Sequence, residues 1–167
     1  MARMKTLVFV SIIGLLPFVA LQCAGKNSLY SSKAVSYPID AITKRADIVN
    51  QSIFAMAGFG FTTEYANAAD NFSAVRSEWR LQEQFLVDDP DGAPVMMRDR
   101  ALLHLTPRGT SGAQAERVAS RIEFQVQINN GADDKWLAVE PFPVHKEEYL
   151  KIISDLKIRL NRLGYRF

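Results

Sequence analysis

Apolar positions recur every three or four residues in two parts of the chain, which is the spacing of one face of a helix. The first helix is expected to begin near Pro38 and to end at Gly58 and Gly60, where a glycine can take the left-handed cap conformation. The second closes the chain and is expected to end at Gly164. The apolar positions are Ile39, Ile42, Ala46, Val49, Ile53 and Met56 in the first, and Tyr149, Ile152, Ile153, Leu156, Leu160 and Leu163 in the second.

Between these helices, apolar and polar residues alternate in a series of short segments, the pattern of strands with one dry and one wet face. The segments are 61–65, 75–85, 97–105 and 118–128, with a possible fifth at 136–139, and turn residues separate them. Consecutive strands joined by tight turns favour an antiparallel sheet. We therefore expect a single α+β domain over residues 37–167, in the order α-β-β-β-β-(β)-α, with the N- and C-terminal helices packed on one face of a sheet of four to five strands.

The first 22 residues have a different pattern. Arg3 and Lys5 precede an uncharged apolar run at 7–21, which is shorter than the roughly 20 residues a membrane-spanning helix needs. A basic start followed by a short apolar run is typical of a secretory signal peptide. Residues 23–36 are small, polar and serine-rich, and are expected to form a flexible tether.

The junction at Ala20-Leu-Gln-Cys23 resembles the lipobox of bacterial lipoprotein signals. That resemblance implies cleavage before Cys23, a lipid on its sulfur, and a sorting preference for the outer membrane. Two or more acyl chains would give stable membrane attachment. Ala20 and Gln22 depart from the usual lipobox residues, so an ordinary secreted protein and an uncleaved anchor remain alternatives.

The charge of the chain gives little information about its partners. The net charge of +2 comes from Arg3 and Lys5, and the chain from Cys23 onward has 18 basic and 18 acidic residues. A neutral chain has little long-range attraction to phosphates, so nucleic acid is not an expected partner. A single cysteine excludes an intrachain disulfide and a multi-cysteine zinc site.

Candidate catalytic groups are few. His104 is expected to be exposed on the wet face of its strand, and His145 to cap or border the C-terminal helix. Neither has a metal-ligand spacing, no nucleophile or phosphate-loop motif occurs, and the turn with Asp88, Asp89 and Asp91 lacks the register of a calcium loop. We expect no catalytic residue, no metal, no cofactor and no enzymatic activity.

The wet face of the sheet is a candidate protein-binding face. Arginine makes planar, two-point contacts, and a mixed-charge face rich in it can either bind a protein or simply be solvated. The arginines expected there are Arg76, Arg80, Arg98, Arg100 and Arg121.

The order of elements resembles the helix-grip-like, BamC-like domains of bacterial outer-membrane lipoproteins. The resemblance rests on the opening helix, the glycine-rich exit at 58–61, the strand segment at 77–80 and the closing amphipathic helix. It implies a non-enzymatic module that binds envelope proteins at the periplasmic side of the outer membrane.

The alternative is a carrier of a lipid or small apolar ligand in a groove between sheet and helices. Aromatic residues that could line the groove, or simply form the core, are Phe54, Phe59, Phe61, Trp79, Phe85 and Phe124.

Overall fold

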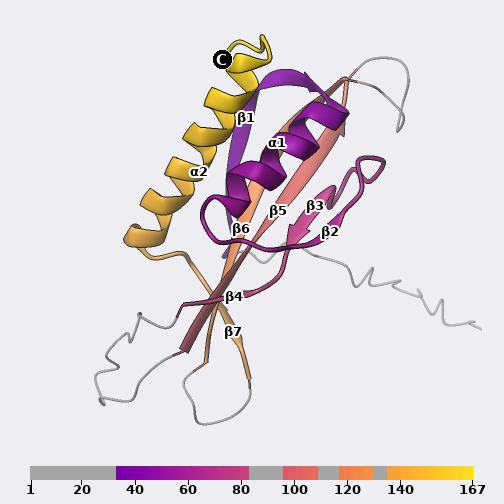
Figure 1. Ribbon diagram of the computed structural model, residues 1–167. Helices are drawn as coiled ribbons and strands as arrows, with labels where there is room; N and C mark the ends of the chain where they lie inside the picture. The colour runs from indigo at the N-terminus through magenta and orange to yellow at the C-terminus, as the bar shows by residue number, and fades with distance from the viewer. Residues whose placement is uncertain (1–32, 83–95, 109–116, 130–134) are drawn as a thin grey trace, which may run out of the picture.

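Seven strands form one antiparallel sheet, and two helices lie on one of its faces (Figure 1). The computed structural model describes residues 33–82, 96–108, 117–129 and 135–167. The elements, in chain order, are β1 (Val35–Lys44), α1 (Arg45–Ala57), β2 (Thr63–Ala66), β3 (Val75–Ser77), β4 (Arg80–Gln82), β5 (Met96–Pro107), β6 (Arg117–Asn129), β7 (Leu137–Val139) and α2 (Pro143–Arg162).

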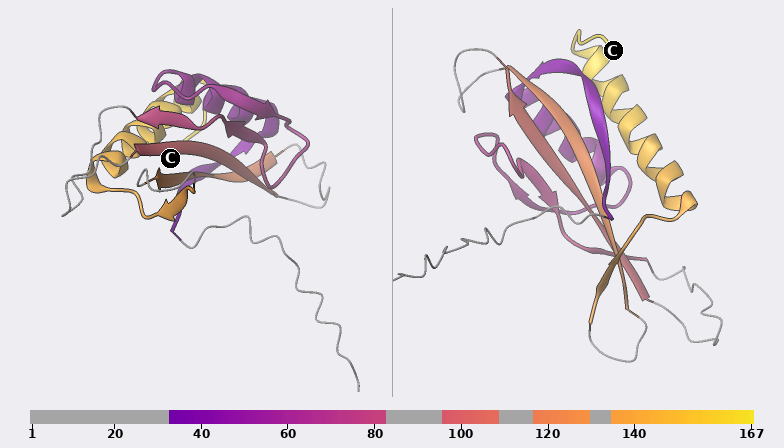
Figure 2. Two further views of the ribbon diagram at one scale, coloured as in Figure 1. Left: turned by 90° about the horizontal axis from the view of Figure 1, so that it is seen from below. Right: turned by 180° about the vertical axis from the view of Figure 1, so that it is seen from behind.

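The long hairpin of β5 and β6 is the centre of the sheet. Their register runs without a shift from the pair Met96 and Asn129 to the pair Pro107 and Val118. The main strand order is β1-β6-β5-β3-β2, with β4 added to β5 and β7 added to β6. Seen from below and from behind, α1 and α2 lie on the same side of this open sheet (Figure 2). The expected α+β class and antiparallel sheet are therefore confirmed.

The expected opening helix is wrong in its first part, and so is the element order. Residues Val35–Lys44 form strand β1, which pairs with β6, and α1 begins only at Arg45. Ile39, Ala41 and Thr43 are buried, so this segment has a period of two, although Ile39 and Ile42 also fit a helical spacing. The order is thus β-α-β-β-β-β-β-β-α, and the sheet has seven strands rather than four to five.

The core lies between the sheet and the two helices. Its clearest contact joins α2 to β6, where the rings of Tyr149 and Phe124 stack with centroids 4.0 Å apart and planes 2° apart. Tyr165, beyond α2, donates a hydrogen bond to Asp47 of α1 and accepts one from the backbone N–H of Lys44. These contacts hold both helices on the same face.

Glycines end both helices, as expected. Gly60 after α1 and Gly164 after α2 have positive φ angles of 82° and 92°.

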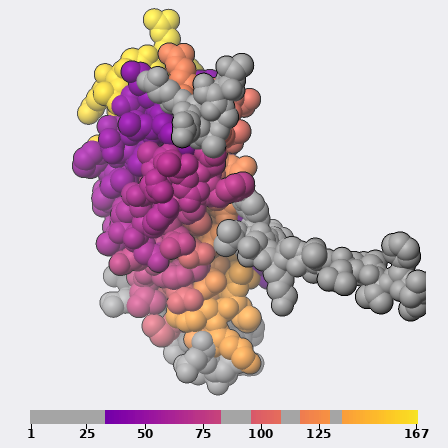
Figure 3. Space-filling view, turned by 90° about the vertical axis from the view of Figure 1, so that its right-hand side faces the viewer, coloured from indigo at the N-terminus to yellow at the C-terminus, as the bar shows by residue number. Residues whose placement is uncertain are grey.

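From the side, α1 and the segment from β2 to β3 form one continuous surface (Figure 3). Among the described residues, no helix is both long and apolar enough to cross a membrane.

Candidate functional site

The face of the sheet opposite α1 and α2, here called the open face, is set by the alternation of β5 and β6. Directly paired residues of an antiparallel ladder share a face. The pair Ala101 and Phe124 faces the helices, since Phe124 stacks on Tyr149. The neighbouring pairs face the other way and form the open face: Arg98 with Gln127, Arg100 with Gln125, Leu102 with Glu123, and His104 with Arg121.

Four of the five expected arginines lie on the open face. Arg98, Arg100 and Arg121 come from β5 and β6, and Arg76 of β3 pairs with Leu102 in the register. Arg76 also makes a two-point ion pair with Glu64, and its guanidinium lies 5.8 Å from the centroid of the Tyr65 ring.

Arg80 lies on the opposite side, so its expected place on the open face is wrong. It pairs with Asp99, which faces the helices. The segment expected as one strand at 75–85 is broken into β3 and β4 by two residues, Glu78 and Trp79. This break changes the parity of the alternation, which turns Arg80 toward the helices. Arg80 is therefore excluded from the candidate binding face.

Two tryptophans stack with arginines on the open face. The guanidinium carbon of Arg98 lies 4.6 Å from the centroid of the Trp79 ring and 4.0 Å from that of Trp136. The guanidinium carbon of Arg100 lies 4.4 Å from the Trp79 centroid. Trp79 comes from the β3–β4 connection, and Trp136 lies just before β7. These positions favour cation–π attraction.

Sequence reasoning missed this cluster. Alternation from Val75 predicts Trp79 on the dry side of the segment 75–85, and the sequence assigns Trp136 only to a short fifth strand. The available signal was their setting: both tryptophans lie beside charged residues, Glu78 and Arg80 in one case and Lys135 in the other. A large aromatic ring among charges is well suited to stack against a guanidinium.

Glutamines hold the stacked arginines in place. Arg98 donates from Nε and Nη2 to Oε1 of Gln127, at 3.0 and 2.7 Å. Arg100 donates from Nε to Oε1 of Gln125, at 2.9 Å, and Gln125 in turn donates to Glu123, at 2.7 Å. Each glutamine is the register partner of its arginine on β5. The orientation of both guanidinium planes is therefore fixed by the strand pairing.

Burial and neighbouring charges act on these groups. Burial lowers the pKa of Arg98. Burial and the charges of Arg76 and Arg98 lower the pKa of Arg100, against smaller opposing effects of Glu64 and Glu123. The guanidinium groups remain charged at neutral pH, so the open face holds two cations that are partly removed from water.

His104 is buried, not exposed as expected. It is 8% exposed, and its Nε2 lies 3.3 Å from Oε2 of Glu123. Burial alone would raise the pKa of Glu123, but hydrogen bonds with His104 and Gln125, together with the charges of His104 and Arg121, bring it below its ordinary value. Alternation assigns a face to a residue but not its depth, because long side chains on adjacent strands can cover it.

His145 is also buried, which corrects its expected position at the surface. It lies in the first turn of α2, and its Nε2 is 3.2 Å from Oε1 of Gln82. Its ring lies near those of Phe142 and Tyr149. The apolar surroundings lower the pKa of His145 through burial.

A second polar cluster lies under the start of α2, on the helix-covered side. Arg80 makes two-point ion pairs with Asp99 and with Glu148, and donates to the backbone oxygen of Phe59. Its guanidinium carbon lies 4.1 Å from the centroid of the Phe61 ring. Burial alone would lower the pKa of Arg80, but its contacts with both carboxylates raise it. The cluster joins β4, β5 and α2 through these contacts.

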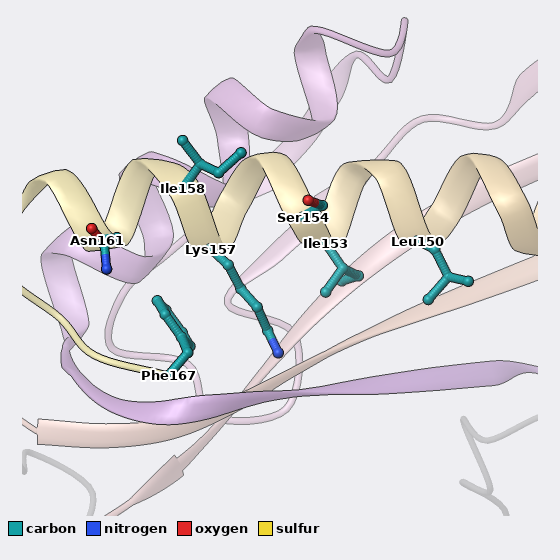
Figure 4. A pocket seen from close by; sticks show the side chains of 7 residues that line it. All are labelled: Leu150, Ile153, Ser154, Lys157, Ile158, Asn161 and Phe167. Carbon is teal, nitrogen blue, oxygen red and sulfur yellow. The ribbon is translucent and has the colours of Figure 1, made fainter.

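The six aromatic residues of the alternative carrier hypothesis do not line one groove. Phe61 and Phe124 are buried in the core, whereas Phe54 is 58% exposed and Trp79 lies on the open face. Phe85 lies outside the described residues. A groove of about 430 Å³ instead runs along α2 to the C-terminal Phe167 (Figure 4). Its lining residues are Leu150, Ile153, Ser154, Lys157, Ile158, Asn161 and Phe167.

Three features of the sequence lie outside the described residues: the signal-like segment at 1–22, Cys23, and the turn with Asp88, Asp89 and Asp91. Within the described ranges, no three His, Cys, Asp or Glu side chains form a group that could hold a metal ion.

Comparisons of the chain with protein-family models, curated proteins and solved structures find no match, so the functional argument rests on the residues described above and their geometry.

Proposed function

We propose that the protein is a non-enzymatic, lipid-anchored binding or assembly module of the bacterial cell envelope. The lipid at Cys23 would hold it at the outer membrane, with the folded domain in the periplasm. An envelope protein would bind to the open face of the sheet. The position of the only cysteine directly after a short apolar run supports the anchor.

The observation that carries the binding proposal is the stack of Trp79, Arg98 and Trp136 on the sheet face that neither α1 nor α2 covers. Tryptophan and arginine are enriched among the residues that contribute most to protein–protein affinity. Gln127 already fixes the guanidinium of Arg98. Binding of a partner would therefore cost less side-chain entropy at Arg98 than it would at a free surface arginine.

The charge of the chain favours a protein over nucleic acid as the partner. From Cys23 onward the basic and acidic residues are equal in number, so the long-range attraction to a phosphate backbone is small. On the open face itself, Arg76 is paired with Glu64 and Glu123 lies beside His104. Carboxylates beside the arginines weaken the attraction to phosphate, while arginine and tryptophan are enriched at protein interfaces.

Site-specific photocrosslinking in the intact envelope tests the proposal. A photoreactive residue replaces Leu81, which pairs with Arg98 in the register and is 54% exposed. The matched control replaces Phe54, which is 58% exposed on α1, on the other side of the sheet. We expect a discrete adduct from position 81 that weakens with Arg98→Gln, and none from position 54. The absence of a position-dependent adduct would contradict the proposal.

A further inference from the structure

We infer that the open face takes an acidic protein segment, whose carboxylates pair with Arg98 and Arg100. This inference rests on the function proposed above and specifies the chemistry of the partner. It is carried by the contacts that these two arginines make and by their spacing on β5.

The arginines of this protein differ in the partners they have. Arg80 contacts the carboxylates of Asp99 and Glu148, Arg76 contacts Glu64, and Arg159 contacts Asp155. Arg98 and Arg100 differ from these. Among the described residues, their side-chain hydrogen bonds go to the amide oxygens of Gln127 and Gln125, and no ion pair with a carboxylate is present. Neutral glutamine amides therefore orient the guanidinium groups of Arg98 and Arg100.

The unused donors point to a carboxylate. An amide oxygen occupies Nε and Nη2 of Arg98 and Nε of Arg100. This leaves donors on Nη1 of Arg98 and on both terminal nitrogens of Arg100 without a partner among the described residues. The two terminal nitrogens of a guanidinium form a planar fork that matches the two oxygens of a carboxylate.

The spacing points to an extended segment. Arg98 and Arg100 are two residues apart on one strand and on one face, so their Cα atoms are separated by roughly 7 Å. Successive side chains on one side of an extended partner have the same separation. A segment with acidic residues at alternate positions would therefore place one carboxylate at each arginine.

The electrostatics of the face agree with this assignment. Burial lowers the pKa of both arginines. For Arg100 the charges of Arg76 and Arg98 act in the same direction, while those of Glu64 and Glu123 oppose them without reversing the shift. A bound carboxylate would stabilise both charged forms. An anionic membrane is a weaker candidate. Electrostatic membrane binding generally uses clusters of about four to eight exposed Lys and Arg, whereas Arg76 on this face is already paired with Glu64 and Arg121 lies near the charge of Glu123.

Intrinsic fluorescence provides a direct test, because the chain has two tryptophans, Trp79 and Trp136, and both stack with Arg98. The full-length protein is titrated with a short peptide in which glutamate and threonine alternate. We expect a saturable change in tryptophan emission that weakens as salt is added, since salt screens exposed charges. A peptide with glutamine in place of glutamate should produce no such change.

Two sets of variants locate the effect. Arg98→Gln with Arg100→Gln should weaken peptide binding by about tenfold or more, because both carboxylate partners are lost. The matched control, Arg162→Gln with Arg166→Gln, removes the same charge from exposed positions and should bind as the wild type does. Gln127→Glu keeps the side-chain shape and supplies an internal carboxylate to Arg98, so it should also weaken binding while the thermal unfolding midpoint stays close to that of the wild type. Gln125 is left unchanged in this set because it donates to Glu123.

The inference would be overturned by equal binding of the glutamine peptide, or by full binding to either set of open-face variants. A response to phosphatidylglycerol vesicles without a response to the peptide would also overturn it, in favour of a lipid surface. A crosslinked partner at position 81 without peptide binding would reject the acidic segment and leave the proposed function standing. Peptide binding without a crosslinked partner would reject the proposed function.

Discussion

Arg80 and Asp99 form a two-point ion pair on the helix-covered side of the sheet, with Nε–Oδ1 and Nη2–Oδ2 distances of 3.0 and 2.8 Å. Asp99 is fully buried and also accepts hydrogen bonds from Tyr149 and Gln82. One carboxylate thus joins β4, β5 and α2. Burial and the neighbouring charge of Asp99 raise the pKa of Tyr149, so the phenol stays protonated and remains a donor.

Removing this carboxylate should destabilise the domain strongly. Asp99→Ala leaves the guanidinium of Arg80 with Glu148 alone and leaves the Tyr149 hydroxyl without its acceptor. We expect a loss of about 3–5 kcal/mol in the free energy of unfolding, measured by urea denaturation. The control is Glu64→Ala, which breaks an exposed ion pair with Arg76 and should cost less than about 1 kcal/mol. Similar losses in the two variants would argue against the structural role of the buried pair.

The end of α1 offers a matched pair of glycine substitutions. Gly60 has a φ of +82°, so Gly60→Ala should cost about 1–2 kcal/mol through its backbone conformation alone. Gly58 has right-handed helical geometry, and an added Cβ would meet neighbouring oxygens at 3.4 and 3.6 Å, which is ordinary contact. Gly58→Ala should therefore be neutral or slightly stabilising. Thermal unfolding of both variants measures the difference, and equal midpoints would contradict the left-handed cap.

The stability of the domain should fall on mild acidification because of His145. Burial holds its pKa below the ordinary value of about 6.5, against the opposing charges of Asp99 and Glu148 and with the help of Arg80. As the pH drops below about 6.5, the unfolded chain binds a proton that the folded chain still excludes. The contribution is thus fully present above that pH and is lost between it and the lower folded pKa.

The measurement is the thermal midpoint at several pH values between about 7.5 and 5.5. His145→Gln should reduce the slope of the midpoint against pH, whatever its effect on the midpoint itself. Asn161→Gln, an exposed change further along α2, should keep the wild-type slope. A His145→Gln protein with an unchanged slope would show that another group titrates.

The proposed lipid anchor should depend on a single atom, the sulfur of Cys23. Cys23→Ala removes the only thiol of the chain and should abolish labelling with a fatty-acid analogue. The protein should also leave the membrane fraction, because stable attachment needs the acyl chains. Ser28→Ala, close by in the expected tether, should leave labelling unchanged. Label that persists in Cys23→Ala would reject the lipoprotein hypothesis.

The parts of the fold that sequence reasoning found correctly are those with long, regular patterns. β5 and β6 alternate over 12 and 13 residues, so which of their residues share a face follows from the period of two. The same regularity placed Arg98, Arg100 and Arg121 on one face. α2 has 20 residues and shows its helical period over several turns. In segments of this length, one irregular residue does not change the predicted type of element or the face assigned to its residues.

The errors fall where a segment is short or where tertiary contacts decide. The segment with Ile39 and Ile42 is compatible with either a helix or a strand from its sequence. It forms a strand because it pairs with the edge of β6, which is a tertiary contact. Two residues between β3 and β4 reverse the side on which Arg80 lies, and this break has no strong local signal. Trp136 reaches Arg98 only because β7 folds back on β6, a contact that depends on the whole sheet.

The two edges of the main sheet limit how other chains can join it. β1 contains Pro38, which has no backbone N–H, and its register shifts between Ile39 and Thr43, while Asp40 and Lys44 are exposed. β2, at the other edge, has four residues. Proline, bulges, charges and short strands all discourage strand addition. Copies of the domain held at high local concentration could therefore lie side by side without polymerising through these two edges.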